Sequence, residues 1–249
     1  MKAYKLNIVI VGSTSMIAER CVRLWVKNTS VNLNLIGRDV VRLKAIASDL
    51  MIRSPGSNIK YFNVDYQNYK KIDELISHLH KINKIDLALI AHGSLPDQFI
   101  CQHNPKIMVS EIYTNAISPA IFAEIFYKNM QNNNKSKIIL IGSVAGDRGR
   151  KSNYLYGASK GFLERFSEGL RHRSGNRGPK IIFVKPGPTD TPMTSKIKGI
   201  ILADSDEVAL DIVNGVHRGK TQIYAPKKWR YIMFIIRHLP NFIFNKLNI

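Results

Sequence analysis

The feature that most constrains this chain is a repeated alternation between short apolar runs and stretches with helical spacing. Short apolar runs are typical of strands that are buried on both faces of a sheet, and the intervening helices supply the crossover connections that parallel strands need. The alternation predicts an α/β fold with a doubly wound parallel sheet, the Rossmann fold, in a single domain over residues 1–225. We expect strands at residues 6–11, 31–36, 59–64, 85–91, 137–141, 180–185 and 222–225. We expect helices at residues 15–28, 39–53, 69–82, 105–130 and 153–173.

The charge of the chain is unusual for a globular protein of ordinary composition. Its 249 residues carry 37 Lys and Arg against 18 Asp and Glu, a net charge of +19. Such a field attracts anions, whether nucleic acid, acidic lipid headgroups or phosphorylated substrates, although drift towards Lys and Asn gives the same excess. No Arg-rich run or basic–aromatic repeat indicates a nucleic-acid reader, so we expect no nucleic-acid partner.

Two cysteines, Cys21 and Cys101, lie far apart and show no metal-binding spacing. We therefore expect no metal site and a reducing, cytoplasmic location. An apolar strand begins close to Tyr4, which argues against a signal peptide, and no run of about 20 apolar residues predicts a membrane-spanning helix.

The end of the first predicted strand is a candidate phosphate-binding loop. Gly12 permits a tight turn, and hydroxyl and N–H groups at the start of a helix favour a phosphate. The candidate cofactor residues here are Gly12, Ser13, Thr14, Ser15, Met16 and Ile17. The alternative is an ordinary helix start with a capping residue, which would have the same sequence pattern.

The end of the second predicted strand indicates which dinucleotide is bound. An NAD-preferring site would place an acidic residue here for the ribose 2′-hydroxyl, whereas this chain has Gly37 followed by Arg38. A guanidinium suits a 2′-phosphate, so we expect NADP(H); the alternative is a surface arginine that opens the next helix. The next two strand ends add candidate contacts: Asp65 for the adenine, and Ala91, His92 and Gly93, where a glycine lets the backbone approach a cofactor.

Three residues form the candidate catalytic group. Ser143 follows the fifth predicted strand, and Tyr156 and Lys160 share one helix face because they are four residues apart. An ammonium beside a phenol is expected to lower the phenol pKa, so that Tyr156 can exchange a proton with a ketone or alcohol oxygen. Ser143 can donate a hydrogen bond to the same oxygen as charge develops.

With these motifs in this order, the chain resembles the short-chain dehydrogenase/reductase family over residues 5–225. The resemblance implies that Asn115 holds Lys160 and a proton-relay water, and that the segment after the sixth strand meets the nicotinamide. The residues of that segment are Pro186, Gly187, Thr189 and Thr191. The glycine loop departs from the family pattern, because Met16 and Ala18 occupy its second and third glycine positions.

One branch of the family is more similar than the rest. The loop from Gly12 to Ala18, the segment 91–98 and the Trp229-Arg-Tyr-Ile-Met sequence resemble reductases that act on decaprenylphosphoryl-2-keto-pentose. This resemblance implies a lipid-linked or nucleotide-linked sugar ketone and a role in envelope polysaccharide synthesis. A general carbonyl or acyl-chain reductase, a cofactor-binding sensor without turnover and an oligomerising scaffold are the alternatives. Residues 194–204 are expected to form a substrate lid, or else a plain surface helix.

The last 24 positions, residues 226–249, form a basic, aromatic-rich tail. Cations interleaved with aromatic residues suit a helix that lies on an anionic membrane surface. We therefore expect a cytoplasmic protein held peripherally on the inner face of the membrane. The alternative is that the tail packs on the core or on a neighbouring subunit of a homo-oligomer.

Overall fold

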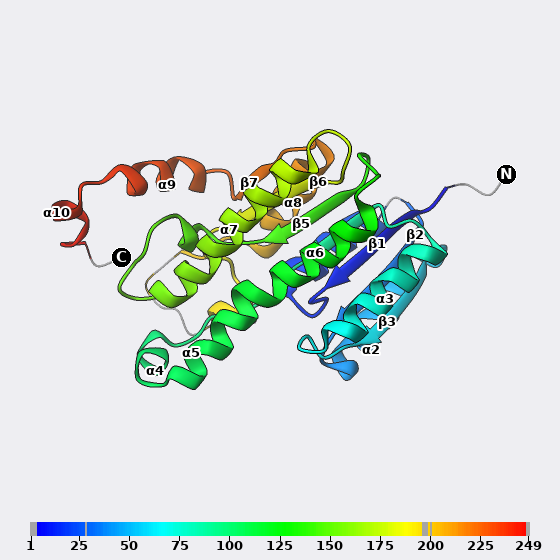
Figure 1. The fold of residues 1–249 in the computed structure, drawn as a ribbon, viewed down its shortest axis with the longest axis horizontal. Helices are drawn as coiled ribbons and strands as arrows, with labels where there is room; N and C mark the ends of the chain where they lie inside the picture. Colours follow the sequence, from blue (N-terminus) through cyan, green and yellow to red (C-terminus); the bar gives the residue numbers. More distant parts are fainter. Residues whose placement is uncertain (1–3, 28, 196–198, 200, 248–249) are drawn as a thin grey trace.

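The computed structural model describes residues 4–27, 29–195, 199 and 201–247, and its centre is one parallel sheet of seven strands (Figure 1). The strand order is β3-β2-β1-β4-β5-β6-β7, so the sheet grows outward in both directions from the β1/β4 pair. This is the doubly wound arrangement that the alternating sequence predicted. The strands are β1 (Leu6–Val11), β2 (Val31–Gly37), β3 (Asn58–Asn63), β4 (Leu87–Ile90), β5 (Lys137–Ile141), β6 (Lys180–Pro186) and β7 (Gln222–Ala225).

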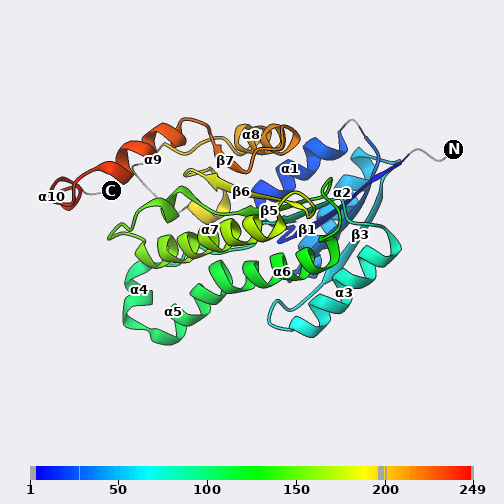
Figure 2. The same cartoon turned by 45° about the horizontal axis from the view of Figure 1, so that its top comes forward.

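Helices cover both faces of the sheet, as Figures 1 and 2 show from two directions. On one face, α1, α2 and α8 pack against side chains such as Ile8 and Ile10; on the other, α3, α6 and α7 pack against Val9 and Val11. All four of these β1 side chains are fully buried, which explains why the strand is apolar at successive positions rather than at alternate ones. The covering helices are α1 (Met16–Val26), α2 (Val40–Arg53), α3 (Tyr69–Ile82), α6 (Ser118–Met130), α7 (Tyr154–Ser174) and α8 (Ser205–His217).

The helix expected at residues 105–130 is continuous but not regular. It consists of α5 (Pro105–Ile112), a π-helical turn (Tyr113–Ile117) and α6. A π turn accommodates one extra residue per turn and often lies at a functional site. Asn115 lies in the middle of this turn and is fully buried.

Several short elements were not predicted from the sequence. They are α4 (Gln98–His103), the 3-10 turns Val144–Asp147 and Pro192–Thr194, and helix α8. The tail, for which a surface helix was expected, contains two helices, α9 (Trp229–His238) and α10 (Asn241–Phe244). The expected lid at 194–204 falls partly on residues 196–198 and 200, which lie outside the described residues. Next to them, Thr189 and Ala203 form a parallel bridge.

The tail packs on the domain through one side of α9. Met233 is fully buried, and the Trp229 indole lies so close to Gly187 that a Cβ on that glycine would be 2.0 Å from its Nε1 atom. Arg148 also donates hydrogen bonds to the carbonyl oxygens of Ile236 and Leu239. None of the described helices is both long enough and apolar enough to cross a bilayer.

Candidate active site

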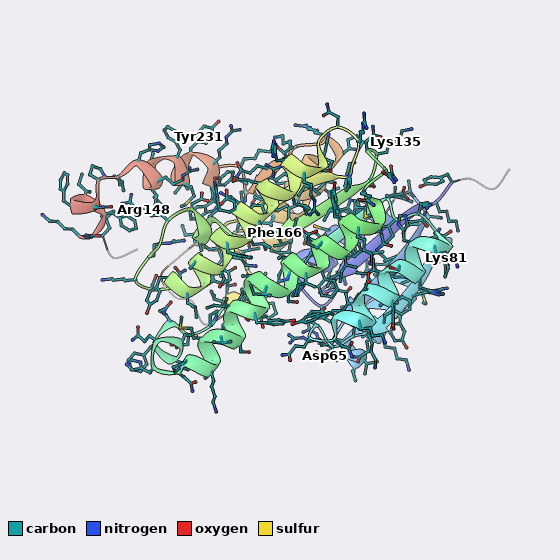
Figure 3. All side chains as sticks on the ribbon, viewed as in Figure 1. Asp65, Lys81, Lys135, Arg148, Phe166 and Tyr231 are labelled. Atoms are coloured by element: carbon teal, nitrogen blue, oxygen red, sulfur yellow. The ribbon has the colours of Figure 1, made fainter. Side chains whose placement is uncertain are left out.

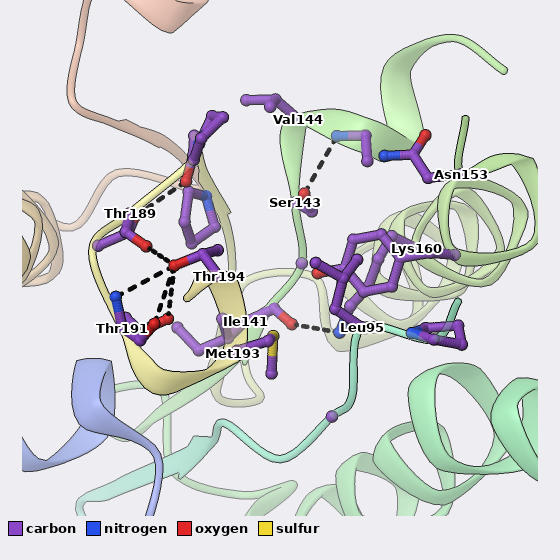
Figure 4. A pocket seen from close by; sticks show the side chains of 18 of the residues that line it. Leu95, Ile141, Ser143, Val144, Asn153, Lys160, Thr189, Thr191, Met193 and Thr194 are labelled. Carbon is purple, nitrogen blue, oxygen red and sulfur yellow. Dashed lines mark hydrogen bonds between the residues drawn. The ribbon is translucent and has the colours of Figure 1, made fainter. Parts of the chain in front are cut away.

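A cavity of about 700 Å³ opens at the carboxyl ends of the central strands (Figure 4). In a doubly wound sheet this is the ligand-binding edge, because the loops that leave β1 and β4 turn in opposite directions there. The loops after β1, β4, β5 and β6 all contribute lining residues, as does the start of α7. The expected site residues that line it are Ser15, Ile17, Ala91, His92, Gly93, Ser143, Tyr156, Lys160, Pro186, Gly187, Thr189 and Thr191.

Ser143, Tyr156 and Lys160 meet in this cavity as the sequence predicted. Ser143 follows β5 in extended conformation, and its Oγ accepts a hydrogen bond of 3.1 Å from the Ala145 N–H, which orients the hydroxyl. Lys160 is buried, and its Nζ lies 5.7 Å from the centre of the Tyr156 ring. The same Nζ donates a hydrogen bond of 3.2 Å to the carbonyl oxygen of Ile141 (Figure 4), so the end of β5 positions it.

The electrostatics of this group differ in one respect from the sequence-based expectation. Burial raises the pKa of Tyr156, with the Ser143 hydroxyl opposing the shift, whereas we expected a lowered pKa beside Lys160. Burial also lowers the pKa of Lys160 to about 8. The loss of hydration therefore sets the direction of both pKa shifts in the protein alone, and Tyr156 stays protonated at neutral pH.

Asn115 contacts the loop after β4. Its Oδ1 accepts a hydrogen bond of 3.0 Å from the Ser94 N–H, and its Nδ2 donates one of 3.0 Å to the Glu111 carbonyl oxygen. A Cβ on Gly93 would lie 2.9 Å from Asn115 Oδ1 and 3.4 Å from Lys160 Nζ. Gly93 thus allows Asn115 and Lys160 to approach each other, although no direct hydrogen bond joins them in the described structure.

His92 is a buried, neutral residue beneath the loop after β1. Burial lowers its pKa to about 3, and the positive charges of Lys160 and Arg38 act in the same direction. Its Nε2 lies 2.9 Å from the Ser118 Oγ, and its ring is 4.6 Å from that of Tyr66. Such a histidine cannot serve as a proton carrier near neutral pH, which agrees with its exclusion from the catalytic group.

The loop after β1 is shaped by a close backbone contact. Gly12 has a φ of +77°, and a Cβ there would lie 2.5 Å from the backbone nitrogen of His92. Ser13 differs from the expectation, because its hydroxyl points inward and donates to the carbonyl oxygens of Ile10 and Ile36. Ser15 is the N-cap residue of α1, and its side chain makes no capping hydrogen bond, so its hydroxyl is available to a ligand.

Two arginines lie beside this loop. Arg38 is exposed, and its guanidinium carbon lies 5.4 Å from the centre of the Tyr66 ring. Arg42, which sequence reasoning missed, donates a hydrogen bond of 3.0 Å to the carbonyl oxygen of Thr14. Within the described residues neither arginine has a carboxylate partner. The sequence could have indicated Arg42, because it lies four residues after Arg38 at the start of a helix.

Two of the residues expected to contact the cofactor, Asp65 and Thr189, make hydrogen bonds within the protein. The Asp65 carboxylate accepts a hydrogen bond of 3.0 Å from the Gln67 N–H and stabilises a turn. The Thr189 hydroxyl donates to the carbonyl oxygen of Gly187 at 2.8 Å, and Thr194, a residue missed from the sequence, donates to the Thr189 carbonyl oxygen at 2.5 Å. These bonds hold the segment after β6 in a fixed shape along the cavity wall (Figure 4).

A buried ionic network includes an acidic residue of the turn that follows Ser143. Lys185 contacts the carboxylates of Asp147 and Glu164, and the Tyr224 hydroxyl donates to Asp147 at 2.9 Å. Burial alone would lower the pKa of Lys185, but the two carboxylates outweigh it and raise the pKa. Asp147 belongs to the turn that follows Ser143, so this network fixes the base of that turn.

The sequence profile that describes short chain dehydrogenases matches residues 6–199. The chain belongs to this family. It is 23% identical over 241 residues to an uncharacterised oxidoreductase of Streptomyces coelicolor, covering 97% of this chain and 95% of that one. It is 25% identical over 180 residues to human 3-oxoacyl-[acyl-carrier-protein] reductase, covering 72% and 74%. Among solved structures, a short chain dehydrogenase of Burkholderia cenocepacia in complex with NADP superposes with a TM-score of 0.83 at 18% identity, covering both chains completely.

Proposed function

We propose that this protein is an NADP(H)-dependent oxidoreductase that reduces a ketone to an alcohol, or catalyses the reverse reaction. The observation that carries the proposal is the convergence of Ser143, Tyr156 and Lys160 in one cavity at the carboxyl edge of the sheet. NADPH would supply the hydride. The protein's own groups would orient the ketone, provide the proton and stabilise the charge that develops on the oxygen.

Each residue has a distinct role in this mechanism. Tyr156, which stays protonated because burial raises its pKa, donates the proton to the ketone oxygen. Ser143 donates a hydrogen bond to the same oxygen. Lys160 stabilises the phenolate that remains and holds the nicotinamide ribose, while Asn115 supports Lys160 from the π turn across Gly93.

The residues around the loop after β1 fit a dinucleotide with a 2′-phosphate. The close contact of Gly12 with His92 holds the loop after β1 against the end of β4. The start of α1 and the Ser15 hydroxyl therefore remain open to a pyrophosphate. Arg38 and Arg42 supply two guanidinium groups without carboxylate partners in the described structure, which suits a phosphate dianion. The NADP bound in the Burkholderia cenocepacia structure supports the same choice of cofactor.

For the substrate we propose a lipid-linked or nucleotide-linked sugar ketone of envelope polysaccharide synthesis, as in the decaprenylphosphoryl-2-keto-pentose reductase branch. The loop Gly12 to Ala18, the segment 91–98 and the Trp229 sequence support this branch. The runner-up is a general carbonyl or acyl-chain reductase, which the similarity to the human 3-oxoacyl-[acyl-carrier-protein] reductase favours. A non-catalytic sensor of NADP(H) is less well supported, because binding alone does not require all four catalytic side chains.

We further propose that the tail holds this cytoplasmic protein on the inner face of the membrane. While α9 packs through Met233, its other side exposes Tyr231, Phe234 and Ile235, and α10 exposes Phe242. The exposed cations Lys228, Arg230 and Arg237 accompany these side chains. Aromatic residues with interleaved cations suit an anionic lipid interface, whereas a second copy of the chain is the alternative occupant of this face.

The experiment that tests the function is a product screen. Purified protein with NADPH is incubated with lipid-linked and nucleotide-linked sugar ketones, 3-oxoacyl thioesters and simple ketones. Mass spectrometry then detects products that are two hydrogens heavier. A two-hydrogen product that requires both NADPH and Tyr156 would support the reductase function, and the substrate that yields it would decide between the sugar and acyl-chain alternatives.

A further inference from the structure

The wall of the cavity beyond the catalytic residues contains three polar atoms with no partner. Gln98 Nε2, Arg150 Nε and Asn153 Oδ1 are inaccessible to solvent and make no hydrogen bond in the described structure. All three residues line the cavity that contains Ser143 and Tyr156. Figure 4 shows Asn153 on the side of the cavity where Ser143 and Val144 lie. A fourth unpaired atom of a lining residue, His92 Nδ1, lies beneath the loop after β1. Buried polar groups of a native protein are nearly always paired, so the three unpaired atoms on this other part of the wall indicate a missing ligand.

The local structure fixes how these groups are presented. The Oε1 atom of Gln98 accepts a hydrogen bond of 2.9 Å from the Leu155 N–H at the start of α7, which leaves the amide nitrogen as the free end. The Asn153 N–H donates a hydrogen bond of 3.1 Å to the Arg150 carbonyl oxygen, so the two residues belong to one tight turn, and both line the cavity. The three atoms are thus held by α4 and by the turn that precedes Tyr156.

Arg150 carries a positive charge that no carboxylate neutralises directly. Within the described residues it forms no ion pair, and Asp147, the acidic residue that acts on it electrostatically, is already bonded to Lys185 and Tyr224. A partly buried guanidinium in this state is stabilised when a ligand brings an anionic oxygen to it.

We propose that Gln98, Arg150 and Asn153 form a recognition site for a ketone that carries several hydroxyl groups and an anionic group, such as a phosphorylated sugar ketone. Arg150 and Gln98 donate to anionic and hydroxyl oxygens, and Asn153 accepts from a hydroxyl. An apolar ketone or acyl chain leaves all three atoms unpaired, and sites of this kind reject such analogues strongly. The inference rests on the proposed ketone reductase function and names the substrate class and the residues that select it.

The test compares D-ribulose 5-phosphate with cyclohexanone, a ketone without hydroxyl or anionic groups. The kcat/KM of each is measured from NADPH oxidation, and saturation-transfer NMR on the NADP⁺-loaded protein measures binding of the same two ketones. Arg150→Met removes the charge and the donors at similar length. Gln98→Glu keeps the acceptor for the Leu155 N–H but replaces the free donor by a carboxylate. Lys81→Met, an exposed change on α3 far from the cavity, reproduces the loss of one positive charge (Figure 3).

We expect the wild-type protein to prefer the pentulose phosphate. Arg150→Met and Gln98→Glu should each lower its kcat/KM, or weaken its binding, by about 10-fold to 100-fold, the scale of a lost charged hydrogen bond. Cyclohexanone should respond little to either change, Lys81→Met should affect neither ketone, and Arg150→Lys should restore part of the loss.

Three outcomes would overturn the proposal: a wild-type preference for cyclohexanone, no binding of the pentulose phosphate, or equal losses for both ketones in both variants. Failure of the reductase function itself is distinguishable, because it would appear as NADPH oxidation that Tyr156→Phe leaves unchanged.

Discussion

The guanidinium of Arg148 donates a hydrogen bond of 2.6 Å to the carbonyl oxygen of Leu239, joining two residues that are 91 positions apart in the chain. The same guanidinium donates to the Ile236 carbonyl oxygen at 2.5 Å and lies 3.8 Å from the centre of the Phe244 ring. Figure 3 shows Arg148 next to the tail, on the segment that runs from Ser143 towards α7. One side chain therefore closes the carboxyl end of α9 and connects the tail to the wall of the active site.

Arg148→Met should release the tail while leaving the sheet intact. Hydrogen bonds to a charged group contribute about 1.5–3 kcal/mol, so amide protection in α9 should fall by about 10-fold to 100-fold. Hydrogen–deuterium exchange measured at residues 229–238 and in β1 checks this. Arg177→Met, at an exposed arginine without a described hydrogen bond, is the matched control. Unchanged exchange in α9 would show that Met233 and Trp229 suffice to hold the tail.

Tyr156→Phe should abolish most of the turnover without disturbing the fold. The change removes the phenolic proton donor but keeps the ring that packs in the cavity, and a positioned acid contributes about 100-fold or more to the rate. The measurement is kcat for the best ketone, with NADPH binding measured in parallel. A variant that binds NADPH normally and retains near-normal kcat would show that another group donates the proton.

The pH dependence of ketone reduction should reflect Lys160. Burial lowers its pKa to about 8, so its ammonium loses the proton as the pH rises through that value. The pKa of Tyr156 is shifted upward, so the phenol remains protonated over the same range. Because both the cationic lysine and the protonated phenol favour reduction, kcat/KM should fall above pH 8 or so. A profile measured between pH 6 and 10 or so checks this, and a flat profile over that range would contradict it.

Arg38→Asp should reverse the preference between the two nicotinamide cofactors. A carboxylate there repels a 2′-phosphate and accepts from a ribose hydroxyl, so binding of NADPH should weaken by about 10-fold to 100-fold relative to NADH. Fluorescence titration with both cofactors measures the ratio. Arg42→Met serves as a second variant, expected to weaken NADPH without improving NADH. Equal affinity of the unmodified protein for NADPH and NADH would refute the assignment of the two arginines.

The centre of the sheet could be predicted because β1, β4, β5 and β6 are buried along nearly their whole length and therefore form almost continuous apolar runs. Helix α3 was predicted with its observed limits, Tyr69–Ile82, because its apolar residues recur at helical spacing. The π turn around Asn115 could not be predicted in this way. It inserts one residue into a segment whose composition is helical throughout, and the Asn115 contact with the loop after β4 joins residues that are distant in the sequence.

The candidate site was predictable where the chemistry is local and unpredictable where distant segments meet. Tyr156 and Lys160 are four residues apart, so one helix sets their relation. By contrast, Gln98 begins α4 and Arg150 lies in the loop before α7, and only the fold brings them to one cavity. The inward rotation of the Ser13 hydroxyl likewise depends on Ile36, a residue of the neighbouring strand.

The exposed face of the tail leads to the last prediction, which concerns membrane binding. Phe234 and Ile235 on α9 and Phe242 on α10 are 65%, 62% and 70% exposed, and each is an apolar side chain that water solvates poorly. Cations near an anionic lipid surface contribute about 1 kcal/mol each, so the neighbouring Lys228, Arg230 and Arg237 should strengthen binding appreciably at low salt. Intact protein should therefore float with vesicles that contain anionic lipid and remain unbound with neutral vesicles.

Matched variants distinguish membrane binding from self-association as the role of this exposed face. Phe234→Ser with Phe242→Ser removes exposed aromatic side chains while keeping Met233 and the Arg148 contacts, so the tail should stay folded but lose vesicle binding. Phe99→Ser, an exposed aromatic on α4, is the control. Sedimentation equilibrium of the same proteins reports self-association. The membrane proposal fails if the intact protein does not float with anionic vesicles at low salt and forms a dimer that is lost in the double serine variant. The exposed face would then be a contact between copies of the chain.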